Sequence, residues 1–132
     1  LKNILEKKHF QKHIEKLSAK YKNKKILLYG AGVFARVILD AYDVSNLNII
    51  AISDLKYNTQ EKKPLYGIKP CSLNAIEQIN PDVILITAFD EKQIKSFLIG
   101  NYPSLRKKSI QAFIKRNLRE KLEMLLNRYK IR

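Results

Sequence analysis

Two short, mainly apolar runs constrain the fold of this chain most. One covers Ile26–Tyr29 and ends in Gly30, and the other covers Val83–Ala88. Apolar runs of this length are typical of strands that are buried on both faces of a parallel sheet. Between the two runs, residues 32–43 repeat apolar side chains at helical spacing, and Leu47–Ser53 has the composition of a second strand. The order strand, helix, strand predicts a parallel sheet with crossover helices.

The rest of the chain continues this alternation of short strands and helices. We expect a strand at Gly67–Cys71, a helix over 73–79 and a strand at Ser109–Ile114. A further helix is expected from Asp90 to about Leu98; it opens with a capping box of Asp90 and Gln93, and Gly100, Asn101 and Pro103 break the chain after it. The fold class is therefore α/β and Rossmann-like, with a mostly parallel sheet of four to five strands flanked by helices. In such sheets the ligand binds at the carboxyl ends of the strands.

The net charge of +14 is concentrated at the two ends of the chain. Residues 1–25 carry nine lysines against two glutamates, and residues 106–132 carry ten basic residues against two glutamates. The segment between them has seven basic and eight acidic residues and is close to neutral. We therefore expect three parts: a basic amphipathic helix at 1–23, a Rossmann-like domain at 24–114 and a basic helix at 115–132.

Both terminal helices are predicted to carry an apolar stripe at spacings of three and four residues. The stripes are Phe10, Ile14, Leu17 and Tyr21 in the first helix, and Leu118, Leu122, Leu125 and Tyr129 in the last. One stripe is expected to cover the sheet. The C-terminal stripe is long enough to pair with its copy in a second subunit, which predicts a homodimer through the terminal helices.

Composition narrows the class of protein. No run of about 18 apolar residues could span a bilayer, and the single Cys71 fits a reducing compartment, so we expect a cytoplasmic protein without a membrane span. Aromatic residues are not interleaved with the basic ones in a base-stacking pattern, which makes nucleic acid an unlikely partner. His9 and His13 lie four residues apart, but without a third convincing ligand we expect a solvated pair rather than a metal site.

The main chemical signal is a glycine turn between the first strand and the helix that follows it. It has the form G-x-G-x-x-A, with the residues Gly30, Ala31, Gly32, Val33, Phe34 and Ala35. In such a turn the first glycine allows the chain to bend sharply, and the second lets a pyrophosphate approach the backbone. The N-terminus of the helix then faces the phosphates. This pattern predicts a nucleotide site.

Other candidate residues lie at the ends of the same strands. Asp54 follows the second strand, where a carboxylate can accept hydrogen bonds from a ribose diol and would repel a 2′-phosphate. This favours NAD or a uridine nucleotide over NADP. Arg36 could hold a phosphate from the first turns of the helix, or be a solvated surface residue. Thr87, Ala88 and Phe89 are expected at the far side of the pocket, with a place in the core as the alternative for Phe89.

On these residues the sequence resembles a known group, the small Rossmann-like N-terminal domains of bacterial sugar acyltransferases and of membrane-associated UDP-sugar dehydratases. The segments that carry the resemblance are 25–32, 50–54, the loop into 66–68, and 80–86. The resemblance implies that Gly30, Gly32 and Asp54 bind a nucleotide sugar or NAD. Where the acyltransferases have a second glycine-rich tip with a histidine, this chain has Val33, Phe34 and Ala35, and we expect no hexapeptide-repeat domain within these 132 residues.

Two classes of function follow. The first is a module that binds a small-molecule nucleotide, of the NAD or UDP-sugar type, in bacterial surface-polysaccharide or nucleotide-sugar metabolism. The second is a non-enzymatic interaction protein whose basic terminal helices bind an acidic partner or nucleic acid. No catalytic acid, base or nucleophile is recognisable, so the isolated chain is expected to bind without turnover. The nucleotide-binding module is expected to be either a free-standing subunit or a piece of a larger surface-polysaccharide enzyme, and the first residue, Leu1 rather than Met, favours the second alternative.

Overall fold

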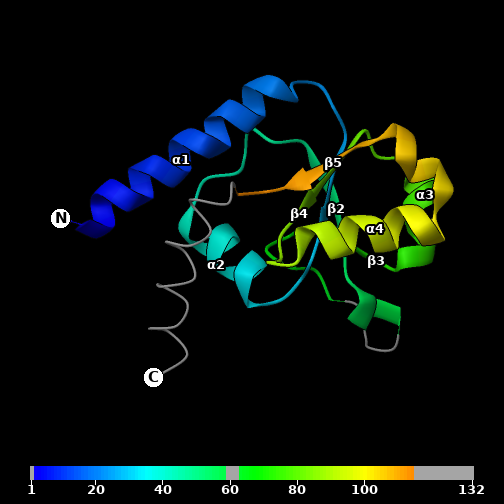
Figure 1. Ribbon diagram of the computed structural model, residues 1–132. Helices are drawn as coiled ribbons and strands as arrows, with labels where there is room; N and C mark the ends of the chain where they lie inside the picture. Colours follow the sequence, from blue (N-terminus) through cyan, green and yellow to red (C-terminus); the bar gives the residue numbers. More distant parts are fainter. Residues whose placement is uncertain (1, 59–62, 115–132) are drawn as a thin grey trace.

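The computed structural model describes residues 2–58 and 63–114, of which residues 2–8 are described by their backbone alone. They form an α/β fold with a five-stranded sheet and helices on both faces (Figure 1). In chain order the elements are α1 (Lys2–Lys20), β1 (Ile26–Tyr29), α2 (Val33–Ala41), β2 (Ile49–Ser53), η1 (Leu55–Asn58), β3 (Pro70–Cys71), η2 (Leu73–Ala75), α3 (Ile76–Ile79), β4 (Val83–Ile86), α4 (Glu91–Asn101), η3 (Pro103–Lys107) and β5 (Ser109–Ala112), where η denotes a short 3-10 helix.

The sheet has the strand order β3-β2-β1-β4-β5, and every pairing is parallel. The predicted fold class is confirmed. At the carboxyl end of β1, Tyr29 pairs with Ser53 of β2 on one side and with Ile86 of β4 on the other. After β1 the chain continues to β2 on one side of the sheet, and after β4 it continues to β5 on the other side. β1 and β4 therefore flank the topological switch point, at which open α/β sheets bind ligands.

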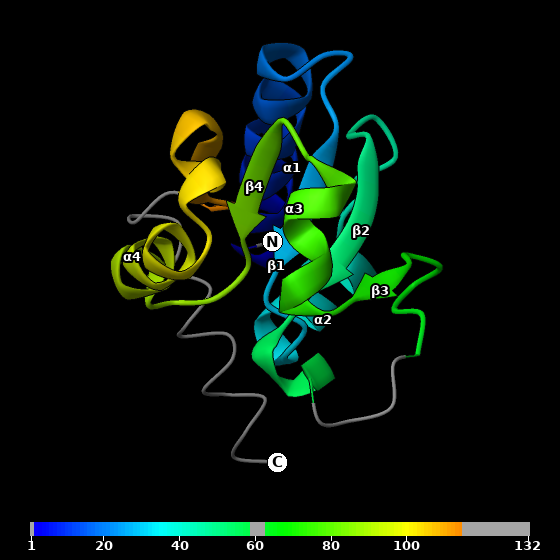
Figure 2. The same cartoon turned by 90° about the vertical axis from the view of Figure 1, so that its right-hand side faces the viewer.

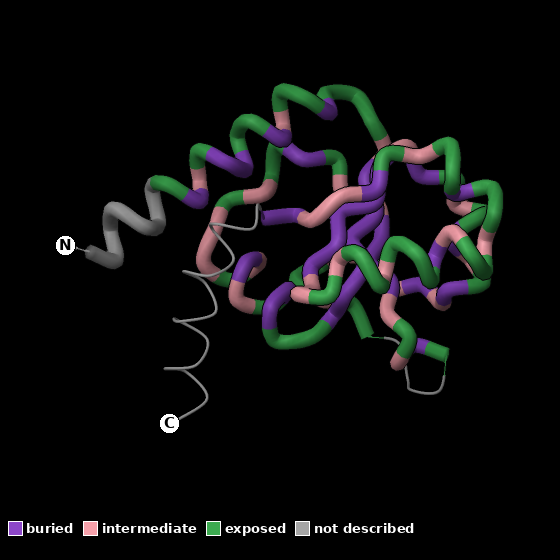
Figure 3. The backbone as a smooth tube through the Cα atoms, viewed as in Figure 1, coloured by how far each residue is buried: buried purple, intermediate pink, exposed green. Residues whose placement is uncertain are grey.

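The central strands are buried on both faces because their side chains alternate between two cores. Ile26 and Leu28 of β1 belong to the core shared with α1 and α2, whereas Leu27 and Tyr29 belong to the core under α3 and α4. Figure 2 shows α3 and α4 in front of the sheet and α1 behind it. In Figure 3 the buried backbone is concentrated in the strands, as expected for a sheet covered on both sides.

Helix α1 covers one face of the sheet with its apolar stripe. Phe10, Ile14, Leu17 and Tyr21 are all buried in the core beneath it. His13 lies on the same side of the helix, where its Nε2 is 2.7 Å from the carbonyl oxygen of Phe113, just after β5. The predicted solvated histidine pair is therefore wrong: His13 is buried and hydrogen-bonded to the backbone, while His9 is exposed.

The ends of several elements differ from the prediction: β2 begins at Ile49, β3 covers only Pro70–Cys71, and β5 ends at Ala112. Helix α4 continues through Gly100 and Asn101 and ends before Pro103, because a glycine within a helix costs only about 1 kcal/mol and does not stop it. The side chain of Asp90 makes no capping hydrogen bond, so the expected capping box is not formed. Strand β4 ends at Ile86, two residues earlier than expected, since Thr87 already turns toward the neighbouring loop.

Two further expectations concern the C-terminal helix and the absence of a membrane span. The C-terminal stripe of Leu118, Leu122, Leu125 and Tyr129 lies outside the described residues, so the predicted homodimer stays a prediction. Among the helices that the structure describes, none combines the length and the hydropathy that crossing a bilayer requires.

Candidate functional site

The glycine turn lies at the carboxyl end of β1, in the centre of the sheet. Gly30 has a φ of +117°, a conformation that side-chain-bearing residues rarely adopt. A Cβ atom on Gly30 would also stand 2.7 Å from the carbonyl oxygen of Thr87. The N–H of Gly30 donates to the carbonyl oxygen of Ser53 in β2 at 2.8 Å, which ties the turn to the neighbouring strand. Glycine is therefore required here by both conformation and space.

Thr87 holds the turn from the side of β4. Its hydroxyl lies 2.6 Å from the carbonyl oxygen of Gly30 and 3.0 Å from that of Tyr29, and its N–H donates to the Tyr29 carbonyl at 2.8 Å. The side chain is buried and faces the turn rather than the solvent. Thr87 thus shapes the backbone that a phosphate would approach.

Replacing Thr87 by valine should destabilise the fold by about 1–3 kcal/mol, because the buried carbonyl of Gly30 would lose a hydroxyl donor that valine cannot replace. Urea unfolding of the purified chain measures this loss. Thr87→Ser keeps the hydroxyl and loses only a methyl group, so its cost should be about 1 kcal/mol or less. Equal losses for the two variants would contradict the role of the hydroxyl.

Helix α2 begins directly after the turn and points its N-terminus at the carboxyl edge of the sheet. Gly32 is the N-cap residue, and a Cβ atom on it would meet nothing within 4 Å. Val33 is half-exposed, whereas Phe34 and Ala35 are buried, with the Phe34 ring packed against Phe89 at a centroid distance of 4.6 Å. The first N–H groups of a helix have no acceptor within it, so they are available to an anion in front of Gly32.

Asp54 and Lys56 hold Ala31 of the turn from two sides. The N–H of Ala31 donates to Oδ2 of Asp54 at 2.7 Å, and the Lys56 ammonium donates to the Ala31 carbonyl at 2.7 Å. The other carboxylate oxygen, Oδ1, accepts the N–H of Lys56 at 3.0 Å. Sequence reasoning placed Asp54 in this site but missed Lys56, although its position two residues after the acid at a strand end was a usable signal.

Two more polar side chains, Tyr57 and Arg36, are connected with Asp54, because Asp54 and Arg36 both act electrostatically on Tyr57. Arg36 is exposed on α2, and its positive charge reaches the hydroxyl of Tyr57, which follows Lys56 in η1. Burial raises the pKa of the Tyr57 hydroxyl, the negative charge of Asp54 raises it further, and Arg36 opposes both effects. The hydroxyl of Tyr57 therefore stays protonated at neutral pH.

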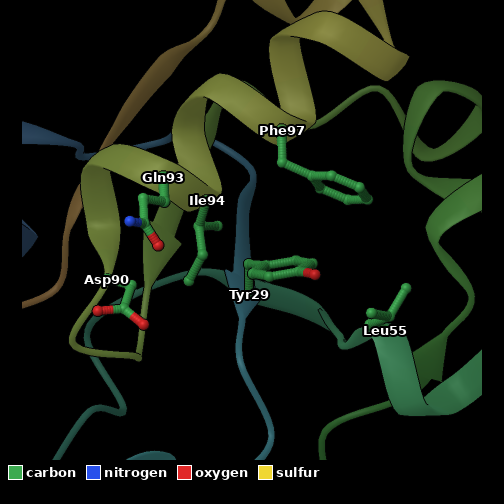
Figure 4. A pocket seen from close by; sticks show the side chains of 6 residues that line it. All are labelled: Tyr29, Leu55, Asp90, Gln93, Ile94 and Phe97. Carbon is green, nitrogen blue, oxygen red and sulfur yellow. The ribbon is translucent and has the colours of Figure 1, made fainter.

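On the other face of the sheet, a hollow of about 250 Å³ opens next to the turn (Figure 4). It is lined by Tyr29, Leu55, Asp90, Gln93, Ile94 and Phe97. Of the residues expected at the far side of the pocket, Ala88 is half-buried in the core under α4 and Phe89 packs on Phe34, so neither lines this hollow. Burial raises the pKa of the Tyr29 hydroxyl, and the charge of Asp54 adds to this shift.

A metal centre has no support in the described part of the chain, where no three His, Cys, Asp or Glu side chains gather in a way that could hold an ion. The groups around the glycine turn itself are backbone N–H groups, the Asp54 carboxylate, the Arg36 and Lys56 cations and the Tyr57 hydroxyl, while Asp90 and Glu91 lie further along the same edge, at the start of α4. Such a set suits the binding of a phosphorylated ligand with hydroxyl groups.

A known family of domains matches most of the chain. Residues 25–113 match the family model of the PglD N-terminal domain. The chain belongs to this family. PglD is a bacterial sugar acyltransferase, so the resemblance to N-terminal domains of such enzymes is confirmed at the level of the family. The region matched to the PglD N-terminal domain contains the glycine turn, Asp54, Lys56 and Thr87. No curated protein and no solved structure matches the chain significantly.

Proposed function

We propose that this chain binds a nucleotide, and most specifically a nucleotide sugar, as a module of bacterial sugar modification. The observation that carries the proposal is the Gly30–Gly32 turn at the start of α2, beside the switch point of the sheet. The membership of the chain in the PglD N-terminal domain family supports a sugar-linked ligand. The phosphates would lie in front of Gly32, where the N–H groups of α2 face open space.

The charged residues at the starts of α2 and α4 favour α2 as the helix that binds the phosphates. The first turn of α2 has no acidic residue, and Arg36 and Lys56 lie close to its start. Helix α4 begins at the same edge but opens with Asp90 and Glu91, whose charges disfavour an anion there. The phosphate subsite is therefore assigned to α2.

Asp54 would accept the ribose hydroxyls. Each of its carboxylate oxygens already accepts one backbone N–H, but an ionised carboxylate has about four acceptor sites, which leaves room for a diol. The same charge would repel the 2′-phosphate of NADP. The ligand classes that fit are thus UDP-sugars and NAD.

Thermal unfolding of the chain with UDP, a UDP-sugar, NAD, NADP and coenzyme A tests the proposal. A ligand that binds at the turn and is present at 100 times its Kd should add about 2.7 kcal/mol to the stability of the folded state. We expect this stabilisation from a UDP-sugar or NAD and a clearly smaller one from NADP. Failure of every phosphate-bearing compound to raise the unfolding temperature at millimolar concentration would refute nucleotide binding.

A further inference from the structure

The amino edge of the sheet, opposite the glycine turn, carries a concentration of positive charge. All the strands are parallel, so the connections that lead into them lie at this one edge. In Figure 2 the arrows of β2 and β4 point downward, and the amino edge lies at the top, beside the end of α1. The glycine turn and this positive charge therefore lie at opposite ends of the same strands.

Two connections supply the charge. Residues 22–25 lead into β1, and residues 106–108 lead into β5. Because β4 lies between β1 and β5 in the sheet, these connections lie on either side of residues 80–82, which lead into β4. The basic side chains of the two connections form what we call the basic edge: Lys22, Lys24, Lys25, Arg106, Lys107 and Lys108. All of them are exposed except Lys25 and Lys108, which are partly exposed.

One carboxylate, that of Asp82, lies between the two connections. Its Oδ2 accepts the N–H of Lys25 at 2.8 Å. This hydrogen bond lowers the pKa of the Asp82 carboxyl, and the charges of nearby lysines from both connections lower it further. The Lys108 ammonium donates to the amide oxygen of Asn80 at 2.6 Å, which is a neutral partner. Asp82 offsets one of the six charges, so the basic edge keeps a net positive charge that an anionic partner would neutralise.

The basic edge is suited to recognise charge and not bases. The exposed large apolar side chains in the described part of the chain are Val33, Leu55, Tyr66 and Phe97, and none of them belongs to the basic edge. Surfaces that bind single-stranded nucleic acid present aromatic rings, and those that bind a duplex place a helix or a β-ribbon in a groove. The basic edge consists of a loop and the end of a short 3-10 helix, so it presents neither.

The distribution of charge favours a flat anionic surface as the partner. Neighbouring strands lie about 5 Å apart, so the connections into β1, β4 and β5 form a row that a plane can contact all at once. At the opposite edge, cations such as Lys56 and Lys92 are mixed with the carboxylates of Asp54, Asp90 and Glu91. A negatively charged plane therefore attracts the basic edge more strongly than the opposite edge and orients the molecule.

We propose that the basic edge docks on an anionic lipid bilayer, with the glycine turn facing away from it. The contact is electrostatic and involves no insertion of α1, because the apolar stripe of α1 is buried in the core of the domain. The inference does not rest on nucleotide binding, since the residues that carry it lie at the other end of the strands. It assigns to the chain a membrane surface in addition to a ligand site.

Co-sedimentation with vesicles tests the proposal on the full chain. The vesicles contain phosphatidylcholine and phosphatidylglycerol in about equal parts, and pure phosphatidylcholine vesicles give the uncharged reference. A triple variant of the basic edge, Lys22→Gln with Lys24→Gln and Lys107→Gln, should bind the anionic vesicles about 100-fold more weakly, because each lysine near such a surface strengthens binding about fivefold. Raising the salt concentration to about 0.5 M should release the parent chain.

A matched control removes the same number of charges elsewhere. Lys63, Lys92 and Lys95 are exposed and lie outside the basic edge, and changing all three to glutamine should weaken binding no more than about fivefold. Both triple variants keep the remaining basic residues of the chain, including those in 115–132, so the comparison concerns location and not net charge. Arginine at positions 22, 24 and 107 keeps the charge and should bind as the parent chain does.

Three results would overturn the proposal. Equal losses in the two glutamine variants would mean that net charge determines binding, and equal binding to both kinds of vesicle, or to neither, would exclude an anionic bilayer as the partner. Fluorescence anisotropy with a labelled RNA strand and a labelled DNA duplex covers the third result. If a nucleic acid binds more tightly than the vesicles at equal phosphate concentration, and the basic-edge variant loses that binding, the surface serves nucleic acid and the bilayer assignment is wrong.

Discussion

Gly30→Ala should destabilise the folded chain by about 2–5 kcal/mol. A non-glycine residue at a φ of +117° is strained by about 1–3 kcal/mol, and the added Cβ would stand 2.7 Å from the carbonyl oxygen and 3.0 Å from Oγ1 of Thr87. Both atoms belong to Thr87, directly after β4, and its hydroxyl and N–H are bonded to the carbonyl oxygens of Tyr29 and Gly30, so Thr87 cannot move away without breaking these hydrogen bonds. Equilibrium unfolding in urea measures the loss.

Gly100→Ala is the matched control for that measurement. Gly100 lies inside α4, has no positive φ, and a Cβ atom on it would meet nothing within 4 Å. Alanine at this place should raise the stability by about 0.5–1 kcal/mol, because it restricts the unfolded chain and favours the helix. The same substitution at two glycines thus has opposite signs. A Gly30→Ala variant as stable as the parent chain would mean that the turn does not require its left-handed conformation.

The fold could be predicted from the sequence because its strongest signals are local. The apolar runs Ile26–Tyr29 and Val83–Ile86 are the two central strands, and the glycines after the first of them mark the turn into α2. The apolar stripe of α1 predicted a covered face without saying which one. The ends of elements were harder to predict: α4 passes through Gly100 because packing of Leu98 and its neighbours outweighs the small cost of a helical glycine.

The site could be predicted only in part, because its geometry is made by residues far apart in the chain. The motif predicted the turn, yet the hydrogen bonds that hold it come from Asp54, Lys56 and Thr87, which lie 23 to 57 positions away from their partners. Spacing along the chain does not tell whether a carboxylate at a strand end faces a ligand or a backbone N–H. In the structure Asp54 already binds the backbone.

The hollow had no signal in the sequence at all. In the sequence, its lining residue Tyr29 has the pattern of an ordinary strand residue, and Phe97 that of one apolar position in an amphipathic helix. They meet only because α4 crosses the face of the sheet to which Tyr29 points. An argument from periodicity assigns both residues to a core, and only the exposure of Phe97 distinguishes it from one.

Gly32→Val should abolish nucleotide binding while leaving the fold largely intact. A Cβ atom on Gly32 meets no other atom within 4 Å, and the φ of −92° suits any residue, so the free protein should lose only about 1 kcal/mol through the poorer N-cap. The bound state is different, because the valine methyl groups would project into the space in front of α2 that the phosphates need.

We expect the affinity of Gly32→Val for a UDP-sugar or NAD to fall at least about 100-fold, which corresponds to ~2.7 kcal/mol. Titration calorimetry measures the affinity, and urea unfolding of the same sample shows that the fold persists. Gly32→Ala, with one methyl group in the same space, should lie between the parent chain and the valine variant. Gly30 and Gly32 stand two residues apart in one motif, yet the first should act on stability and the second on binding. Full affinity in Gly32→Val would move the phosphate site away from the N-terminus of α2.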